Sequence, residues 1–231
     1  MIVAKVPPAS APDAGPGPGL APASCLHVDE QLLALVKPAG LLAVPGRGAD
    51  KADCLLTRAQ RHWPDALVVH RLDQATSGLM LLARGATMQR ALSIAFAERR
   101  VHKRYQALVH GRLSAPAGDD GWHHIELPLI VDWPNRPRSK VDHASGKPSL
   151  TRWRVLGHDA ARDITRVELE PVTGRSHQLR VHLQAIGHPI VGDALYGPPD
   201  GAARLMLHAC ALRLAHPADG RTLTLSSRAP F

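Results

Sequence analysis

The stretch LVVHRLDQATSGLMLLA constrains the fold more than any other part of the chain. Its apolar runs at residues 67–69 and 79–83 predict two short buried strands. The polar loop between them carries His70, Arg71 and Asp73. Rigid strands that hold a polar loop are a common support for binding and catalytic groups. Asp73 can be a turn residue whose side chain accepts a backbone N–H, or a functional carboxylate with partners elsewhere in the chain.

The charge balance indicates a polyanionic partner. The 231 residues include 28 Lys+Arg against 20 Asp+Glu, which gives a formal charge of +8 and a sequence pI of about 10.0. Such a balance does not distinguish RNA from DNA or from a membrane surface. Arginine is much commoner than lysine, which fits either bidentate recognition of phosphates and bases or a GC-rich genome.

Cysteine usage and hydropathy indicate a soluble protein of the cytoplasm. Cys25, Cys54 and Cys210 are far apart and form no CxxC pair or disulfide framework, as expected in a reducing compartment. No apolar run approaches the roughly 18 residues that a membrane span requires, and the N-terminus lacks the apolar core of a signal peptide. We therefore expect a cytoplasmic protein with no membrane partner, acting as a monomer.

One folded domain is expected after an N-terminal tail. Residues 1–24 are rich in Ala, Pro and Gly and carry almost no charge. Because so little apolar surface cannot offset the entropy of ordering, we expect this tail to be disordered. No globular accessory domain is expected before residues 25–231, which are long enough for one sizeable core.

The hydrophobic pattern predicts an α+β fold. Apolar runs and alternation predict strands, and apolar residues at helical spacing predict helices. Besides the two strands above, strands are expected at residues 32–36, 41–44, 105–111, 146–156, 164–169, 205–214 and 222–225. Helices are expected at residues 53–62, 87–99 and 174–187, and a Gly/Asp-containing loop at 114–124.

Two loops carry glycine or basic residues in patterns that suit nucleic acid. PGRG at residues 45–48 could let a phosphate approach the backbone, but it lacks the spacing of a nucleotide-binding P-loop and also fits a plain turn. The segment DWPNRPRSKV places Arg136, Arg138 and Lys140 near Trp133. This segment fits either a platform that stacks on a base or an ordinary proline-rich surface loop.

The segment GRSHQLRVHLQAIG predicts an amphipathic helix that displays an arginine. Leu179, Leu183 and Ile186 form its apolar face, and Gly187 suits its end. Arg180 lies on another face, where it is either a surface cation or the partner of a carboxylate.

Several chemistries have no motif in this chain. It contains no HExxH, no zinc-like Cys/His cluster, no GxSxG elbow and no Rossmann fingerprint. We therefore expect neither a metal nor a cofactor. The residues alone indicate an RNA-associated α/β or α+β protein and leave open whether it is an enzyme.

Five blocks, in order along the chain, resemble the RluA-type family of RNA pseudouridine synthases. They are KPAGLLAVPG, HRLDQATSG, KRYQALVHG, GRSHQLRVHLQAIGHPIVGD and LHACALRLAHP. LPLIVDWPNRPRSKV, followed by GKP, is similar to the dual-specificity branch, which modifies a loop of 23S rRNA and the anticodon stem-loop of certain tRNAs. Two departures are small: Ser176 replaces a common Thr, and the terminal SSRAPF is less usual.

The resemblance implies a catalytic fold, an activity and partners. The fold would be a long, mostly antiparallel sheet with flanking helices, in two subdomains around a basic cleft. The activity would be isomerisation of uridine to pseudouridine in 23S rRNA and tRNA, with no group supplied or lost.

The resemblance also implies the site residues. Asp73 matches the essential carboxylate, as nucleophile or as base toward the ribose; Arg180 matches its charge partner. Tyr105, which taken alone fits simple packing in a strand, matches a residue that stacks on the target base and can remove its proton. Arg71 matches a residue that fills the space of a flipped nucleotide. The expected RNA-binding residues are His70, Arg71, Arg136, Arg138, Lys140, Arg175 and His177. The alternative is a non-catalytic RNA-binding module on the same fold, and a metal-dependent nuclease is a third option.

Overall fold

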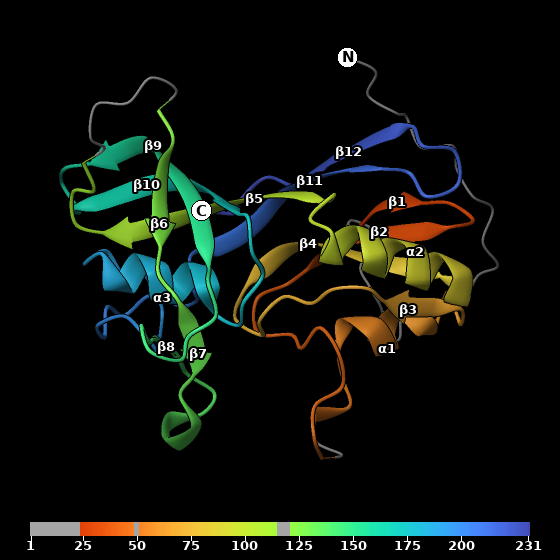
Figure 1. The fold of residues 1–231 in the computed structure, drawn as a ribbon, viewed down its shortest axis with the longest axis horizontal. Helices are drawn as coiled ribbons and strands as arrows, with labels where there is room; N and C mark the ends of the chain where they lie inside the picture. Colours follow the sequence, from red (N-terminus) through yellow and green to blue (C-terminus); the bar gives the residue numbers. More distant parts are fainter. Residues whose placement is uncertain (1–23, 49–50, 115–120) are drawn as a thin grey trace.

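The computed structural model describes residues 24–48, 51–114 and 121–231. Within them, a ten-stranded sheet runs through the molecule in the order β1-β2-β4-β11-β5-β10-β9-β6, with β3 beside β4 and β12 beside β11 (Figure 1). The tail predicted at residues 1–24 lies almost wholly outside the described residues. No helix within the described ranges has the length and apolar character that crossing a membrane requires.

The N-terminal half of the sheet is covered on both faces. It contains β1 (Cys25–Val28), β2 (Leu32–Lys37), α1 (Leu55–Gln60), β3 (Ala66–Val68), β4 (Ser77–Arg84) and α2 (Gly85–Ala97). Leu92 of α2 packs on one face of β2 and β4, and Leu55 of α1 packs on the other. Both strands are apolar almost throughout because neither of their faces meets water.

The C-terminal half packs α3 against one face of the sheet. It contains β5 (His102–His110), β6 (His123–Glu126), β7 (Leu129–Val131), the 3₁₀ helix η3 (Trp133–Asn135), β8 (Ser139–Val141), β9 (Leu150–Asp159), β10 (Ile164–Pro171), α3 (Gln178–Ala185), β11 (Leu207–Ala215) and β12 (Thr222–Ser226). Leu179 and Leu183 of α3 join Val167, Leu169 and Trp153 in one core. Figure 1 shows α3 below β9 and β10 and the β7–β8 hairpin extending away from the sheet.

Strand β11 joins the two halves. It pairs with β4 in parallel and with β5 in antiparallel orientation. Gly78 lies in the parallel pair with a φ of +116°, and a side chain there would overlap the backbone of Ala209. Only glycine fits this close approach, which sets the start of β4 directly against β11.

The α+β prediction is confirmed, and most of the expected strands are present. The sheet is mostly antiparallel, with the single described exception of β4 and β11. The strand predicted at 41–44 is wrong: the chain turns there, and Leu42 makes only an isolated bridge to Cys54.

Other boundaries differ from prediction in the C-terminal half. The predicted basic loop is a short hairpin, β7–β8, around η3. Strand β6 begins inside the loop predicted at 114–124, of which residues 115–120 lie outside the described part. The predicted helix at 174–187 is shortened to α3, because His177 adopts a left-handed φ of 55° just before it.

Candidate active site

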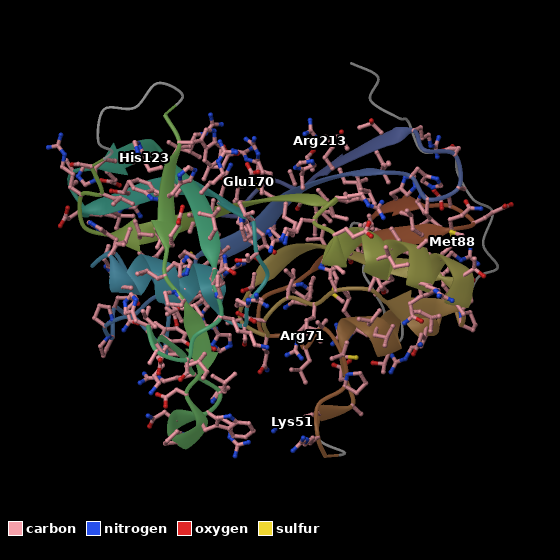
Figure 2. The ribbon with its side chains drawn as sticks, in the orientation of Figure 1. Lys51, Arg71, Met88, His123, Glu170 and Arg213 are labelled. Carbon is pink, nitrogen blue, oxygen red and sulfur yellow. The ribbon has the colours of Figure 1, made fainter. Side chains whose placement is uncertain are left out.

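A cleft of about 470 Å³ lies where the two halves meet. The β3–β4 loop, the end of α2, the start of β5 and the segment before α3 all line it. Its walls include Asp73, Tyr105 and Arg180, so the three predicted catalytic residues share one cavity. Figure 2 shows Arg71 between the two halves, on the side of the sheet from which the β7–β8 hairpin extends.

Asp73 sits in the turn that connects β3 to β4. The turn closes through the backbone, because the Asp73 carbonyl accepts the N–H of Thr76 at 3.1 Å. The carboxylate lies 3.5 Å from Nη1 of Arg180 and 3.9 Å from Nε2 of His177. Its side chain is 24% exposed, so it faces both the cavity and its cationic partner.

Lys37 supports the Asp73 loop from inside the protein. Its side chain is fully buried, and Nζ donates to the carbonyls of Pro38 (2.9 Å), Leu41 (2.7 Å) and Gln74 (3.0 Å). Burial lowers the pKa of Lys37 to about 8, although the nearby Asp73 charge acts in the opposite direction. Lys37 thus ties the residue after Asp73 to the turn at the end of β2.

Arg180 is buried on α3 and held by a second carboxylate. Its Nε and Nη2 donate to the two oxygens of Asp193 at 2.8 and 2.7 Å. Burial opposes the charge of Arg180, but these hydrogen bonds and the Asp193 charge outweigh it and raise the pKa of Arg180. The guanidinium therefore remains charged and turns Nη1 toward Asp73.

A hydrogen-bonded chain connects the β7–β8 hairpin to Asp73. The N–H of Ser139 in β8 donates to the Tyr196 hydroxyl at 2.7 Å. That hydroxyl lies 2.7 Å from Nδ1 of His177. Burial lowers the pKa of His177, so the ring is neutral at pH 7. Its Nδ1 then accepts a hydrogen bond from the Tyr196 hydroxyl. The N–H at Nε2 then faces Asp73.

Tyr105 extends from β5 into the cleft. In the sheet it lies between Leu169 of β10 and Ala209 of β11. Burial, followed by the Asp73 charge, raises the pKa of Tyr105 well above its usual value. The phenol therefore stays protonated at neutral pH, which suits a flat surface for stacking better than a base.

The predicted RNA-binding residues fall into two groups. His70, Arg71, Arg175 and His177 line the cleft. The His70 Nε2 accepts the N–H of Leu81 at 2.8 Å, and its ring stacks on Phe96 at 4.3 Å between centroids. Burial, with the nearby Lys103 charge, lowers the pKa of His70 to about 3, so it forms a neutral wall of the cavity.

The second group lies on the β7–β8 hairpin and is exposed. Its members are Arg136, Arg138 and Lys140. Trp133 at the tip is 66% exposed, and the Arg136 guanidinium lies 4.3 Å from the centre of its ring. Arg138 donates to the carbonyl of Leu195, which fastens the hairpin to the loop after α3.

Metal-ligating side chains are not gathered at this site. Across the described ranges, no group of three or more His, Cys, Asp or Glu side chains is placed to hold an ion.

The sequence that builds this cleft matches a known enzyme family. Residues 31–185 match the model of the RNA pseudouridylate synthase family. The chain belongs to this family. It is therefore an isomerase that acts on RNA.

Relatives of this RNA pseudouridylate synthase cover most of its length. The chain is 46% identical over 209 residues to "Dual-specificity RNA pseudouridine synthase RluA" of Escherichia coli, covering 89% of this chain and 93% of that protein. A protein of the same name from Vibrio cholerae is 47% identical over 195 residues, covering 83% and 77%. The solved structure of human RNA pseudouridylate synthase domain containing 1 has 31% identity and a TM-score of 0.73, covering 90% and 84%.

Three residues that support the active site of this synthase were not predicted from its sequence. Asp193, Lys37 and Tyr196 hold Arg180, the Asp73 loop and His177 respectively. Asp193 and Tyr196 lie in the block GHPIVGDALYG, and Lys37 is the first residue of KPAG. Both segments have the composition of turns. The available signal was an acidic residue thirteen positions after Arg180, which only the fold brings into contact.

Proposed function

We propose that this synthase has dual specificity, and isomerises uridines in loops of 23S rRNA and in tRNA anticodon stem-loops. The relatives at 46% identity carry the words dual-specificity in their names and align with 89% of this chain. Loop uridines are the least costly to flip out of a stack. The cavity of about 470 Å³ offers the space that a flipped nucleotide would enter.

The observation that carries the catalytic proposal is the pairing of Asp73 with Arg180 inside this cavity. Asp73 is the carboxylate that acts on the ribose of the target uridine. Arg180, at 3.5 Å, pairs with that carboxylate and directs it into the cleft. Its own position is fixed by Asp193 on the opposite side of the guanidinium.

Tyr105 and Arg71 handle the base in this proposal. Tyr105 stacks on the uracil while it is detached, turned and rejoined through carbon. Its raised pKa keeps it a neutral phenol beside Asp73, so it adds no second negative charge. Arg71, exposed at the rim of the cavity, takes the space that the flipped nucleotide leaves in the RNA stack.

The remaining predicted residues bind RNA around the cavity. Arg175 and His177 line the same cavity as Asp73 and hold the backbone of the target nucleotide. Arg136, Arg138 and Lys140 contact phosphates along the β7–β8 hairpin, where Trp133 provides a stacking surface. His70 contributes as a wall of the cavity that the base enters.

The proposal includes the setting in which the enzyme acts. Residues 25–231 form the catalytic domain, which works as a monomer in the cytoplasm. Three free cysteines, Cys25, Cys54 and Cys210, support a reducing compartment.

Pseudouridine mapping of total RNA from cells with and without the gene tests the substrates. The expected result is loss of sites in both a 23S rRNA loop and tRNA anticodon arms. Loss in one RNA class alone would reject dual specificity. Complementation with Asp73→Asn should restore no site while the variant still binds RNA, and Arg180→Ala should behave similarly. Restoration by Asp73→Asn would overturn the catalytic assignment.

A further inference from the structure

A second cationic surface lies on the face of the sheet opposite the cleft. Along β5, Lys103 and Tyr105 line the cleft, whereas His102 and Arg104 line a separate cavity of about 370 Å³. Since successive side chains of a strand point to opposite faces, the two cavities lie back to back across the sheet. We call this second face the distal arginine surface. It comprises Arg104, Arg152 and Arg154 around Trp122, together with Arg213, which lines the same cavity as Arg104 and Arg152.

Three of these arginines surround one aromatic ring. The guanidinium carbons of Arg104, Arg152 and Arg154 lie 5.0, 5.0 and 4.8 Å from the centre of the Trp122 ring. Arg104 comes from β5 and the other two from β9, so the cluster spans neighbouring strands of the sheet. Cation–π contacts of this kind hold guanidinium groups in place at a surface.

Two glutamates on the intervening strand β10 orient the arginines from beneath. Glu168 lies 3.1 Å from Nη1 of Arg104 and 2.6 Å from Nη2 of Arg154. The glutamate side chain is 12% exposed, whereas the two arginine side chains are 40% and 38% exposed. The carboxylate therefore lies inside and the guanidinium groups outside, in fixed orientations.

The surface has an excess of positive charge and an open shape. Glu168 and Glu170 pair with three of the four arginines, and the fourth, Arg213, lines the same cavity as Glu170. No described helix covers this face; α3 packs on the opposite one (Figure 1). Figure 2 shows Arg213 and Glu170 on the upper side of the sheet and Arg71 on the lower side. An exposed, preorganised group of guanidiniums matches the geometry of phosphate oxygens.

The distal arginine surface and the cleft reach the same end of β5 and β10, on opposite faces of the sheet. Glu170 of β10 lines the distal cavity, and the next residues, Pro171 and Val172, line the cleft. Arg104 and Tyr105 likewise lie on opposite faces near the start of β5, which pairs with the end of β10. An RNA strand that leaves the cleft at this end of β5 and β10 therefore meets the arginines after crossing the thickness of one sheet.

We propose that the distal arginine surface binds the phosphate backbone of the substrate RNA outside the target loop. The target loop occupies the cleft, and a flanking part of the same molecule crosses the strand ends and reaches Arg213 and its neighbours. This proposal rests on the proposed function in one respect: the RNA used to test it is a tRNA. It implies that a large RNA gains affinity that an isolated stem-loop lacks.

Arg213→Glu tests the surface, because Arg213 is exposed and lies at the edge of the distal cavity. Arg90→Glu on α2 is the matched control, since it makes the same charge change at another exposed position. The two RNAs are a full-length tRNA and the anticodon stem-loop of the same tRNA. Binding is measured by filter retention over a range of salt concentrations, and pseudouridine formation is measured separately.

Arg213→Glu should raise the Kd for the full-length tRNA by about fivefold or more and reduce the salt slope by about one. The Kd for the stem-loop should change by less than about twofold. Arg90→Glu should change neither constant. An equal effect on both RNAs, or none, would overturn the proposal. A tRNA that binds without being modified still tests the surface. Failure of the proposed tRNA substrate can therefore be distinguished from failure of the distal arginine surface. Arg213→Gln, with a measured urea midpoint, separates lost charge from lost folding.

Discussion

Arg180 and Asp193 form a bidentate ion pair in which both side chains are withdrawn from solvent. The Asp193 side chain is 0% exposed and that of Arg180 is 5% exposed. Asp193 accepts hydrogen bonds from two nitrogens of the guanidinium, Nε and Nη2, so the third nitrogen, Nη1, is the one directed at Asp73. The geometry of the proposed catalytic carboxylate therefore depends on a residue that does not touch it.

Asp193→Asn should reduce activity although Asp193 lies behind Arg180. The amide keeps the size of the side chain but loses the charge and one acceptor, so Arg180 shifts toward Asp73. A displacement of this kind can lower kcat by about 100-fold. Breaking a buried pair also costs about 3–5 kcal/mol of stability, with the lower end expected because Asp73 remains as a partner. Single-turnover pseudouridine formation and urea unfolding measure the two effects.

Asp200→Asn is the matched control for that experiment. Asp200 lies in the same loop region and accepts the N–H of Gly192 at 2.7 Å. Its carboxylate contacts the ring of His110 at 2.9 Å instead of Arg180. Asp200→Asn should therefore leave kcat near that of the wild type. Equal activity in Asp193→Asn and Asp200→Asn would contradict the supporting role of Asp193.

Tyr196→Phe should uncouple the β7–β8 hairpin from the active site. The change removes only the hydroxyl that joins Ser139 to His177. The buried N–H of Ser139 loses its partner, at a cost of about 1–3 kcal/mol, and the His177 ring loses the contact that sets its tautomer. Amide exchange at Ser139 should accelerate and kcat should fall about fivefold to tenfold. Unchanged exchange at Ser139 would show that the hairpin is held by other contacts.

Tyr105→Phe should retain more activity than Tyr105→Leu. Because burial and the Asp73 charge raise the pKa of Tyr105, the proposed role is stacking, which a phenyl ring preserves and a leucine does not. Single-turnover assays of both variants, at matched RNA saturation, measure the difference. If the two variants lost activity equally, the hydroxyl rather than the ring would be the functional part.

The sequence revealed the residues whose signal is local. Asp73 stands between two apolar runs, and Arg180 stands on the polar side of a helical repeat, so each was a candidate without a fold. The family resemblance, and not the local pattern, supplied the role expected of each. Asp193 and Lys37 could not be identified in this way, because each occupies a turn sequence and acquires its role from distant partners. The position of β11 was equally inaccessible: it follows β10 in the chain, yet it lies between β4 and β5. Pairings of that kind depend on the whole core rather than on local pattern.

The β7–β8 hairpin contains two strands that were not predicted from the sequence. β7 and β8 are three residues each, and the intervening prolines made the segment look like a loop. Their pairing places Ser139 inside, where it meets Tyr196, and leaves Arg138 and Lys140 outside. An alternation of only three residues is too short to recognise in sequence.

Lys37→Met should change how stability depends on pH. Burial lowers the pKa of Lys37 from 10.5 to about 8 in the folded protein, whereas the unfolded chain keeps the ordinary value. Between pH 8 and 10.5 the unfolded chain therefore binds more protons, so the free energy of unfolding contributed by Lys37 rises with pH. Relative to Lys37→Met, the wild type should gain roughly 2 kcal/mol between pH 8 and pH 10. Urea unfolding at several pH values measures this gain, with exposed Lys140→Met as the control that should run parallel to the wild type. Parallel curves for Lys37→Met as well would show that the lysine beneath the Asp73 loop keeps its ordinary pKa.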